Sequence, residues 1–333
     1  MKAGLLSLAL CLFALGAKAD FDPNLATYEG FISISAKKEL YVEYVSPKNK
    51  MPLVVLLNGL TYSTRQWEDF TRALTARGIG VLRYDMYGMG KTLVKYAPVT
   101  TVIPVEDQVR DLKALFKAMK IKGPYNLVGL SYGGGVAAGY AAAYPEEIKN
   151  LVMMAPFTRA LDSQDQWIRA QIWATRQIFP YNKLSDDELY DYFLHQIIYA
   201  TYPQSEPSAL ENPFKLEGIF RMVQGIRKFR AVDYAPLLPA KKLHLVIARQ
   251  DQYINTSVLE EYWQAAAPEA RASLLYINGS EHKIVEAVPN FSAAWVAEIV
   301  NGNSRLFKGR TFEGYPYRGE VRSENDTINI GKE

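Results

Sequence analysis

Apolar and polar residues alternate along this chain in blocks that predict strands and helices in turn. Short, continuously apolar runs have the length and β-branched content of strands that are buried on both faces of a parallel sheet. These runs are 52–57, 78–84, 125–129, 150–154, 243–248 and 272–277. Two further strands, 28–35 and 40–45, lie so close together that they predict an antiparallel hairpin at a sheet edge.

Stretches with helical spacing lie between the strands, at 63–77, 105–119, 132–144, 258–267 and 289–300. Strand and helix in regular alternation favour parallel strands with right-handed crossovers. The predicted fold is therefore α/β, with a doubly wound, mostly parallel sheet of eight strands.

The segment 156–240 breaks this alternation, because a single crossover helix would normally join the strands on either side of it. Its pattern predicts helices at 163–179, 185–198 and 215–229, the second opened by a Ser185/Glu188 capping box. We expect a helical cap over the carboxyl ends of the strands, where open α/β sheets bind ligands. The cap is rich in aromatic residues: Trp167, Trp173, Phe179, Tyr181, Tyr190, Tyr192, Phe193, Tyr199 and Tyr202. Most should pack the cap onto the body, and a few could line an apolar pocket.

The N-terminal residues 1–19 have the layout of a secretory signal. Lys2 precedes an apolar run at 5–15, and the small-residue pattern Ala17-Lys18-Ala19 precedes Asp20. The apolar run would rise only about 16 Å as a helix, which is too short to span a bilayer. We expect cleavage before Asp20, a periplasmic or secreted protein, and no stable insertion into a membrane.

The domain organisation follows from these boundaries. Residues 20–155 and 241–302 form the predicted core, 156–240 the cap, and 303–333 a charged tail in which no helical period is visible. The single cysteine, Cys11, falls in the predicted signal, so the mature chain would contain no thiol or disulfide.

Composition narrows the choice of function classes. Half of the residues (49%) are hydrophobic and 22% are charged, as in ordinary folded proteins. The formal charge of +3 includes Lys2 and Lys18 of the predicted signal, so the mature chain is almost neutral and has no electrostatic attraction to nucleic acid. The three histidines are far apart and contain no His-x-x-x-His pair, so no metal or other cofactor is expected. The oligomeric state is left open.

The strongest candidate for chemistry is Ser131. It lies in Gly129-Leu130-Ser131-Tyr132-Gly133, between a predicted buried strand and a predicted helix rich in alanine. A serine at such a sharp turn has a strained backbone, and glycines two residues away on each side leave room for it. The context predicts a nucleophile whose hydroxyl points out of the sheet.

A serine hydroxyl needs a base to remove its proton and an acid to orient that base. In this architecture they follow in the order Ser, acid, His, on loops at the carboxyl ends of strands. His282 follows the last predicted strand, whereas His195 lies in a predicted helix and His244 in a strand. Asp251 follows the strand 243–248, with Asp162 as the alternative acid. Tetrahedral intermediates also need oxyanion donors, for which the backbone amides of Tyr132 and Leu60 are placed, and Gly59 lets the second loop approach.

This pattern resembles the α/β-hydrolase superfamily, specifically its cap-bearing lipases, esterases and peptidases, from about residue 28 to residue 300. Five segments match in order: LNGLTYSTRQW, RYDMYGMGKT, GLSYGGG, IARQDQYI and NGSEHK. The resemblance assigns these to the oxyanion loop, the Asp-x-x-Gly-x-Gly segment, the nucleophile elbow, the acid loop and the histidine loop. Members of the superfamily usually carry His-Gly where this chain has Asn58-Gly59, which questions the usual hydrogen bonding of that loop.

We therefore expect an exported serine hydrolase with the triad Ser131, Asp251 and His282. The aromatic cap favours a small-molecule ester with an apolar or medium-sized acyl group as substrate, cleaved through an acyl-enzyme. One alternative is a proline-type aminopeptidase, whose substrate amine would need cap carboxylates such as Glu188, Asp191, Glu206 or Glu211. The other is a non-catalytic protein that binds a ligand or an envelope partner.

Overall fold

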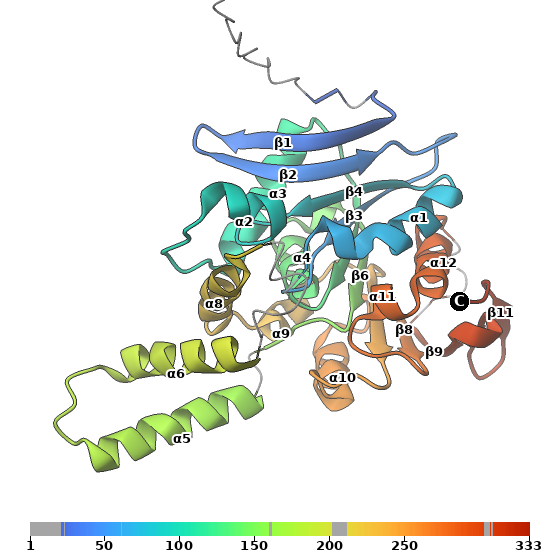
Figure 1. The fold of residues 1–333 in the computed structure, drawn as a ribbon. Helices are drawn as coiled ribbons and strands as arrows, with labels where there is room; N and C mark the ends of the chain where they lie inside the picture. Colours follow the sequence, from blue (N-terminus) through green and yellow to red (C-terminus); the bar gives the residue numbers. More distant parts are fainter. Residues whose placement is uncertain are drawn as a thin grey trace, which may run out of the picture.

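One eleven-stranded sheet runs through the molecule in the order β1-β2-β4-β3-β5-β6-β7-β8-β9-β10-β11 (Figure 1). The computed structural model describes residues 21–22, 24–60, 62–159, 162–201, 212–302, 307 and 309–333, so the predicted signal at 1–19 lies outside the described residues. The strands are β1 Thr27–Ser35, β2 Lys38–Val45, β3 Leu53–Leu57, β4 Gly80–Asp85, β5 Tyr125–Leu130, β6 Ile148–Met154, β7 Leu243–Ala248, β8 Arg271–Ile277, β9 Arg310–Tyr315, β10 Glu320–Arg322 and β11 Thr327–Asn329.

From β4 to β9 in the sheet order each strand is parallel to the next, whereas the pairs at both edges of the sheet are antiparallel. At one edge β1 pairs with β2 and β2 with β4, as the predicted hairpin requires. At the other edge β10 pairs with β9 and with β11. The predicted α/β class and the mostly parallel sheet are confirmed.

The predicted number of eight strands is wrong, because the tail adds three strands to the sheet. Strand β9 pairs with β8 and buries Phe312. Gly314, two residues further on, shares that face, and a Cβ there would lie 2.9 Å from the Phe291 ring. Alternate residues of β9 face the core, and Gly314 is one of them. Because glycine is not apolar in the way that a strand pattern requires, the alternation of apolar and polar residues in the tail is weak.

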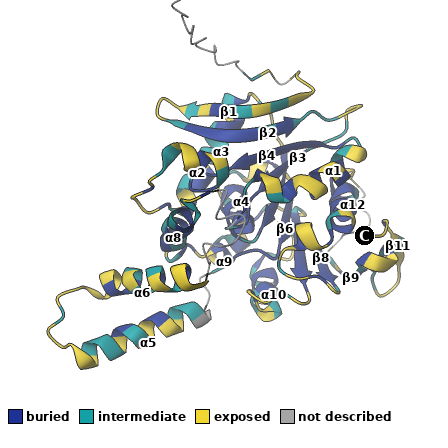
Figure 2. Ribbon diagram, in the orientation of Figure 1, coloured by how far each residue is buried: buried dark blue, intermediate teal, exposed yellow. Residues whose placement is uncertain are grey.

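Helices cover both faces of the sheet. Alternate side chains of β3 enter opposite cores, with Val55 and Leu57 on one face and Val54 and Leu56 on the other. Helices α3 (Val105–Ala118), α4 (Tyr132–Ala143) and α10 (Thr256–Ala265) pack on the first face, and α1 (Glu68–Ala76) and α12 (Pro289–Val300) on the second. Figure 2 shows the central strands of the sheet as mostly buried. Shorter helices are η1 (Thr64–Trp67), α2 (Gly90–Tyr96), η2 (Pro145–Glu147), α9 (Ala231–Tyr234), η3 (Ala235–Leu237), α11 (Ile284–Ala287) and η5 (Pro316–Arg318).

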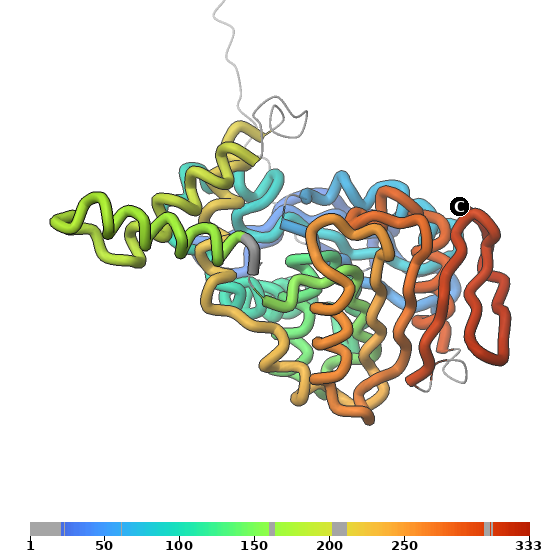
Figure 3. The backbone as a smooth tube through the Cα atoms, turned by 90° about the horizontal axis from the view of Figure 1, so that it is seen from below, coloured from blue at the N-terminus to red at the C-terminus, as the bar shows by residue number. Residues whose placement is uncertain are grey.

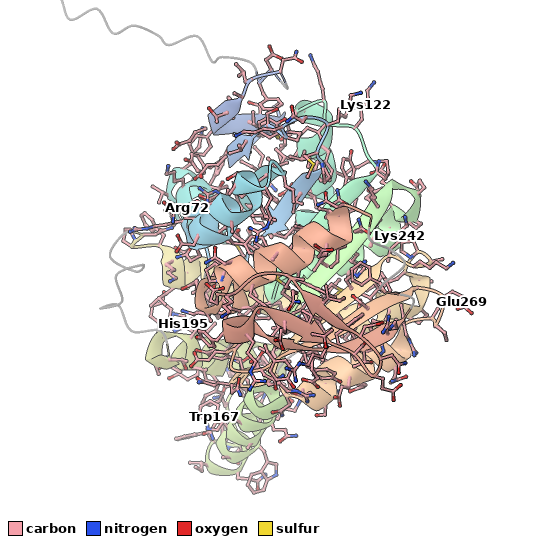
Figure 4. All side chains as sticks on the ribbon, turned by 90° about the vertical axis from the view of Figure 1, so that its right-hand side faces the viewer. Arg72, Lys122, Trp167, His195, Lys242 and Glu269 are labelled. Carbon is pink, nitrogen blue, oxygen red and sulfur yellow. The ribbon has the colours of Figure 1, made fainter. Side chains whose placement is uncertain are left out.

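The insert between β6 and β7 is helical, as predicted. Helices α5 (Asp162–Ile178) and α6 (Asp186–Thr201) form a hairpin that projects from the body in both Figure 1 and Figure 3. Helix α8 (Lys215–Ile226) packs against the hairpin through a separate apolar cluster that includes Ile168, Leu194, Ile198, Leu216 and Ile219. In Figure 4, Trp167 and His195 of the hairpin lie away from Lys122, Lys242 and Glu269, which precede strands β5, β7 and β8. The hairpin is therefore at the carboxyl-end side of the sheet.

Candidate active site

Ser131 occupies a sharp turn between β5 and α4. Its φ of +50° and ψ of −115° are strained values for a residue with a side chain. The turn is held from the neighbouring strand, because the Ser131 amide donates to the Met154 carbonyl at 2.9 Å and the Phe157 amide donates to the Ser131 carbonyl at 2.8 Å. The chain thus has the predicted strand, turn and helix, with the strain at the serine.

The two glycines that flank Ser131 are required by close backbone contacts. A Cβ on Gly129 would lie 2.3 Å from the Gly133 carbonyl oxygen. A Cβ on Gly133 would lie 2.1 Å from the Leu57 carbonyl oxygen at the end of β3. The Gly-x-Ser-x-Gly pattern is therefore needed for the elbow to pack against its neighbouring strand.

His282 and Asp251 are brought together from separate loops that follow β8 and β7. The His282 Nδ1 lies 2.7 Å from Asp251 Oδ2, and the aspartate side chain is 1% exposed against 14% for the histidine. The other carboxylate oxygen, Oδ1, accepts hydrogen bonds from the Tyr253 and Ile254 amides at 2.8 and 2.9 Å. Because a carboxylate only accepts, Nδ1 carries the proton and Nε2 is the nitrogen available to accept another.

A second histidine, His244, also contacts a serine, but this pair lies inside the sheet. His244 Nδ1 lies 2.7 Å from Ser273 Oγ, and both residues are buried cross-strand neighbours in β7 and β8. Burial lowers the pKa of His244 to about 3, with a smaller contribution from Lys242. His244 is the second residue of β7, far along the strand from the loop that carries Asp251. We interpret this pair as part of the sheet core.

Ser131 and His282 line the same cavity, which has a volume of about 170 Å³. The cavity lies between the body and the cap, and Gly59, Leu60 and Tyr132 also line it. The segment 156–240 contributes Phe157, Gln164, Tyr190, Ile198, Val223, Ile226 and Arg227, and the loops of the body add Tyr253, Ile254 and Lys283. All five residues predicted for the site therefore come together, with Asp251 bonded behind the histidine.

The loop after β3 lies directly against the elbow. A Cβ on Gly59 would be 3.7 Å from the Ser131 Cβ, which is ordinary contact distance. Asn58, for which the resemblance to the superfamily led us to expect histidine, is fully buried. Its Nδ2 donates to the Tyr84 carbonyl at 3.0 Å, and its Oδ1 accepts from the Trp67 indole at 2.8 Å. Asn58 thereby ties the loop to β4 and η1.

Asp85 is the aspartate of the Asp-x-x-Gly-x-Gly segment, and its contacts explain why the segment has this pattern. It is fully buried at the end of β4, and its two oxygens accept hydrogen bonds from the Thr64 and Lys91 amides at 2.8 and 2.7 Å. Burial raises its pKa to about 6 despite these bonds. Gly90 has φ +49°, and a Cβ there would lie 2.2 Å from the carboxylate. The segment therefore joins two loops and needs glycine for close packing.

The cap carboxylates that the aminopeptidase alternative requires either contact other protein groups or lie outside the described residues. Glu188 closes the predicted capping box, since its Oε2 accepts from the Ser185 amide at 2.7 Å. Asp191 contacts Arg227 at 3.2 Å. Glu206 and Glu211 lie outside the described residues, as does Tyr202, and so does the side chain of the alternative acid Asp162.

Sequence reasoning missed several cavity residues. Tyr253 stacks edge-on against the His282 ring with centroids 5.2 Å apart, and its position two residues after Asp251 was the available signal. Arg227 and Lys283 carried no such signal. Within the described ranges, no group of three or more His, Cys, Asp or Glu side chains could hold a metal ion. No described helix is long and apolar enough to cross a membrane.

A sheet of this order, with a strained serine elbow and an Asp–His pair on later loops, defines a serine hydrolase of the α/β-hydrolase fold. The family model described as serine aminopeptidase, S33, matches residues 48–287, and this chain belongs to that family.

Its relatives have different activities. The chain is 24% identical over 216 residues to a proline iminopeptidase of Thermoplasma volcanium, covering 60% of this chain and 70% of that protein. It is 25% identical over 119 residues to the human monoacylglycerol lipase ABHD6, covering 35% of this chain and about a third (34%) of the lipase.

Solved structures share the fold. An α/β hydrolase, MGS-M2, from a deep-sea metagenome library has a TM-score of 0.61 and 22% identity, covering 81% of this chain and 97% of that one. A bacterial membrane phospholipase A has a TM-score of 0.61 and 19% identity, covering 84% and 87%. At these identities the likeness shows the fold alone.

Proposed function

We propose that this hydrolase cleaves carboxylic esters, with Ser131 as nucleophile, His282 as base and then acid, and Asp251 as the anion that orients the histidine. The observation that carries the proposal is the Asp251–His282 contact of 2.7 Å at the wall of a cavity that Ser131 also lines. The Leu60 and Tyr132 amides are the proposed oxyanion donors.

The reaction follows from these positions. Ser131 Oγ attacks the ester carbonyl carbon while His282 Nε2 takes its proton, and the carbonyl oxygen becomes an oxyanion between the two amides. The C–O bond to the alcohol then breaks, and the alcohol leaves with the proton from His282. Water, deprotonated by the same nitrogen, attacks the acyl-enzyme and releases the carboxylic acid and the free serine.

The side chains of the cavity support an ester rather than a peptide with a free amine. The cavity's two cationic residues are Lys283 and Arg227, and Arg227 is paired with Asp187 and Asp191. A protonated amine is recognised by a carboxylate, yet no carboxylate is among the described residues that line the cavity. This observation weighs against the aminopeptidase alternative, although the family description and the proline iminopeptidase keep it as the second candidate.

The size of the cavity supports a short or medium acyl group. Its volume of about 170 Å³ lies below the range of roughly 300–1,000 Å³ common for small-molecule sites. Phe157, Ile198, Val223 and Ile226 give it apolar walls, which suit an alkyl chain.

The substrate class can be tested with p-nitrophenyl acetate, butyrate and decanoate against proline p-nitroanilide. We expect kcat/KM to be highest for one of the two shorter esters and at least tenfold lower for the anilide, with all turnover lost in Ser131→Ala. His195→Gln, a histidine on α6 whose ring stacks on Tyr199, is the matched control and should keep full activity. Faster cleavage of the anilide would instead support the aminopeptidase.

We also propose that residues 1–19 direct export and are removed. Expression in a bacterial host followed by mass spectrometry of the periplasmic fraction should give a mature protein that begins at Asp20. Retention of the intact N-terminus in the cytoplasm would contradict export.

A further inference from the structure

The α5–α6 hairpin exposes large apolar side chains among the polar residues of its outer side. Among the described residues, fourteen large apolar side chains are exposed, and eight of them lie on this hairpin and its connecting loop. Five cluster toward its outer end and are called the hairpin tip: Trp173, Ile178, Phe179, Tyr181 and Leu184. Tyr181 is 94% exposed and Trp173 67%. A patch of this kind marks an interaction surface.

The tip is held in place by polar contacts. Arg176 of α5 donates to the Asn182 and Leu184 carbonyls at 3.1 and 2.6 Å and contacts Asp186 at 2.7 Å. The Ser185/Glu188 capping box starts α6 immediately afterwards. The buried side chains of α5 and α6 meanwhile pack against each other and, on α6, against α8. The exposed residues are therefore presented by an ordered loop between two anchored helices.

Side-chain chemistry at the tip indicates the kind of partner. Tryptophan and tyrosine combine an apolar ring with a polar atom, and they gather where hydrocarbon meets headgroups in membranes. We propose that the hairpin tip inserts into the headgroup region of a zwitterionic lipid bilayer. The inference concerns binding to a surface, so it goes beyond the proposed reaction and does not depend on it.

The charges around the tip fit an uncharged headgroup layer. Arg176 is paired with Asp186, and Arg169 with Asp165. The remaining cation, Lys183, precedes the acidic first turn of α6, which holds Asp186, Asp187 and Glu188. The hairpin carries no excess of positive charge that would draw it to an anionic surface, so apolar burial must supply the attraction.

The shape of the hairpin also fits a bilayer. It projects from the body in two perpendicular views, so a flat surface can meet the tip before any other element (Figure 1, Figure 3). The same hairpin contributes Gln164, Tyr190 and Ile198 to the cavity wall. A bound bilayer would therefore lie on the cap side of the molecule, on which the cavity is also built.

The test is flotation with phosphatidylcholine vesicles, using the full chain with the same N-terminus in every variant so that residues 1–19 contribute equally. The wild type should float with the vesicles, equally well in 0.05 and 0.5 M salt and no better when anionic lipid is added. The variant Trp173→Ser/Phe179→Ser/Tyr181→Ser should lose about tenfold or more of its partitioning, since each ring loses its apolar burial. Tyr317→Ser, which removes an equally exposed ring (69%) from the tail, is the matched control and should bind like wild type.

Several results would overturn the proposal. These are failure of the wild type to float, equal flotation of the triple variant, or binding that disappears in 0.5 M salt. Light scattering tests whether a second copy of the chain covers the tip instead. A wild-type dimer that becomes a monomer in the triple variant would contradict the proposal. An unchanged thermal unfolding midpoint shows that the triple variant is folded, and flotation of Ser131→Ala separates this proposal from the proposed reaction.

Discussion

The nucleophile elbow and the cap hairpin differ in how tightly their surroundings constrain them. Around Ser131, backbone atoms lie so close that two glycines are the only residues that fit. The hairpin packs on α8 through α6 and leaves its other side in solvent. The comparison indicates that the body fixes the geometry of the reaction, whereas the cap determines what approaches it. Substitutions in the two regions should therefore affect different measurements.

Among substitutions that keep the serine and the histidine in place, the largest effect on activity is expected from Asp251→Asn. An amide in place of Oδ2 would donate toward His282 Nδ1, which would force the proton onto Nε2, so the ring could no longer accept the serine proton. We expect kcat to fall by about 10³–10⁴-fold with little change in the unfolding midpoint. Asp187→Asn, the same change at an exposed carboxylate of the cap, should leave kcat within about twofold. A similar loss of kcat in both variants would contradict the inference that the body, and not the cap, fixes the geometry of the reaction.

The largest effect on stability is expected from Gly133→Ala. The new methyl would lie 2.1 Å from the Leu57 oxygen and 2.8 Å from the Asn58 oxygen, so the elbow must move. We expect a loss of about 3–5 kcal/mol or failure to fold, measured by urea unfolding. Gly279→Ala is the control, because its φ is +75° but a Cβ there meets no described atom within 4 Å. It should cost only about 1 kcal/mol, and equal costs would mean that crowding is not the cause.

His244 should make the body sensitive to acid. Its pKa is lowered to about 3 in the folded chain, so the unfolded chain binds the proton more readily. The stability contributed by neutral His244 is complete above pH of about 6.5 and is lost as the pH falls toward 3. In His244→Gln, the slope of unfolding free energy against pH between 6 and 4 should be shallower by up to about 1.4 kcal/mol per pH unit. An unchanged slope would refute this assignment.

The smallest effect is expected from Arg227→Met at the cap. Arg227 contacts Asp187 and Asp191 at 2.9 and 3.2 Å and lies 3.6 Å over the Tyr190 ring at the cavity wall. These ion pairs are partly exposed, so stability should change by less than about 1 kcal/mol. KM should change severalfold while kcat stays nearly constant, because the cavity wall moves and the triad does not. A large fall in kcat alone would place Arg227 closer to the chemistry than we infer.

The sequence predicted the body better than the cap, for a physical reason. Strands buried on both faces leave continuous apolar runs, and the elbow leaves its glycines, so the loops carrying Ser131, Asp251 and His282 could be located from pattern alone. Whether residues such as Arg227 and Tyr190 line the cavity depends on how helices distant in the sequence pack together, and no local sequence pattern contains that information. Strand β9 was missed because a core-facing position is Gly314, where the Phe291 ring leaves no room for a Cβ, and β10 and β11 are only three residues long.

The outward side of the hairpin was also hidden from pattern reasoning. The aromatic residues of the cap were expected mainly to pack it onto the body, and Tyr190 and Phe193 do lie in or against the hairpin's inner cluster. Trp173, Phe179 and Tyr181 instead face solvent. An aromatic residue in a sequence does not reveal which side of a helix will be covered, because that depends on where the next element packs.

Covalent labelling with a fluorophosphonate, followed by peptide mass mapping, tests the central assignment most directly. The wild type should carry the phosphonyl group on the peptide that contains Ser131, and labelling should be lost in both Ser131→Ala and His282→Gln. Labelling at another residue, or undiminished labelling in His282→Gln, would contradict the proposed convergence of serine, histidine and aspartate.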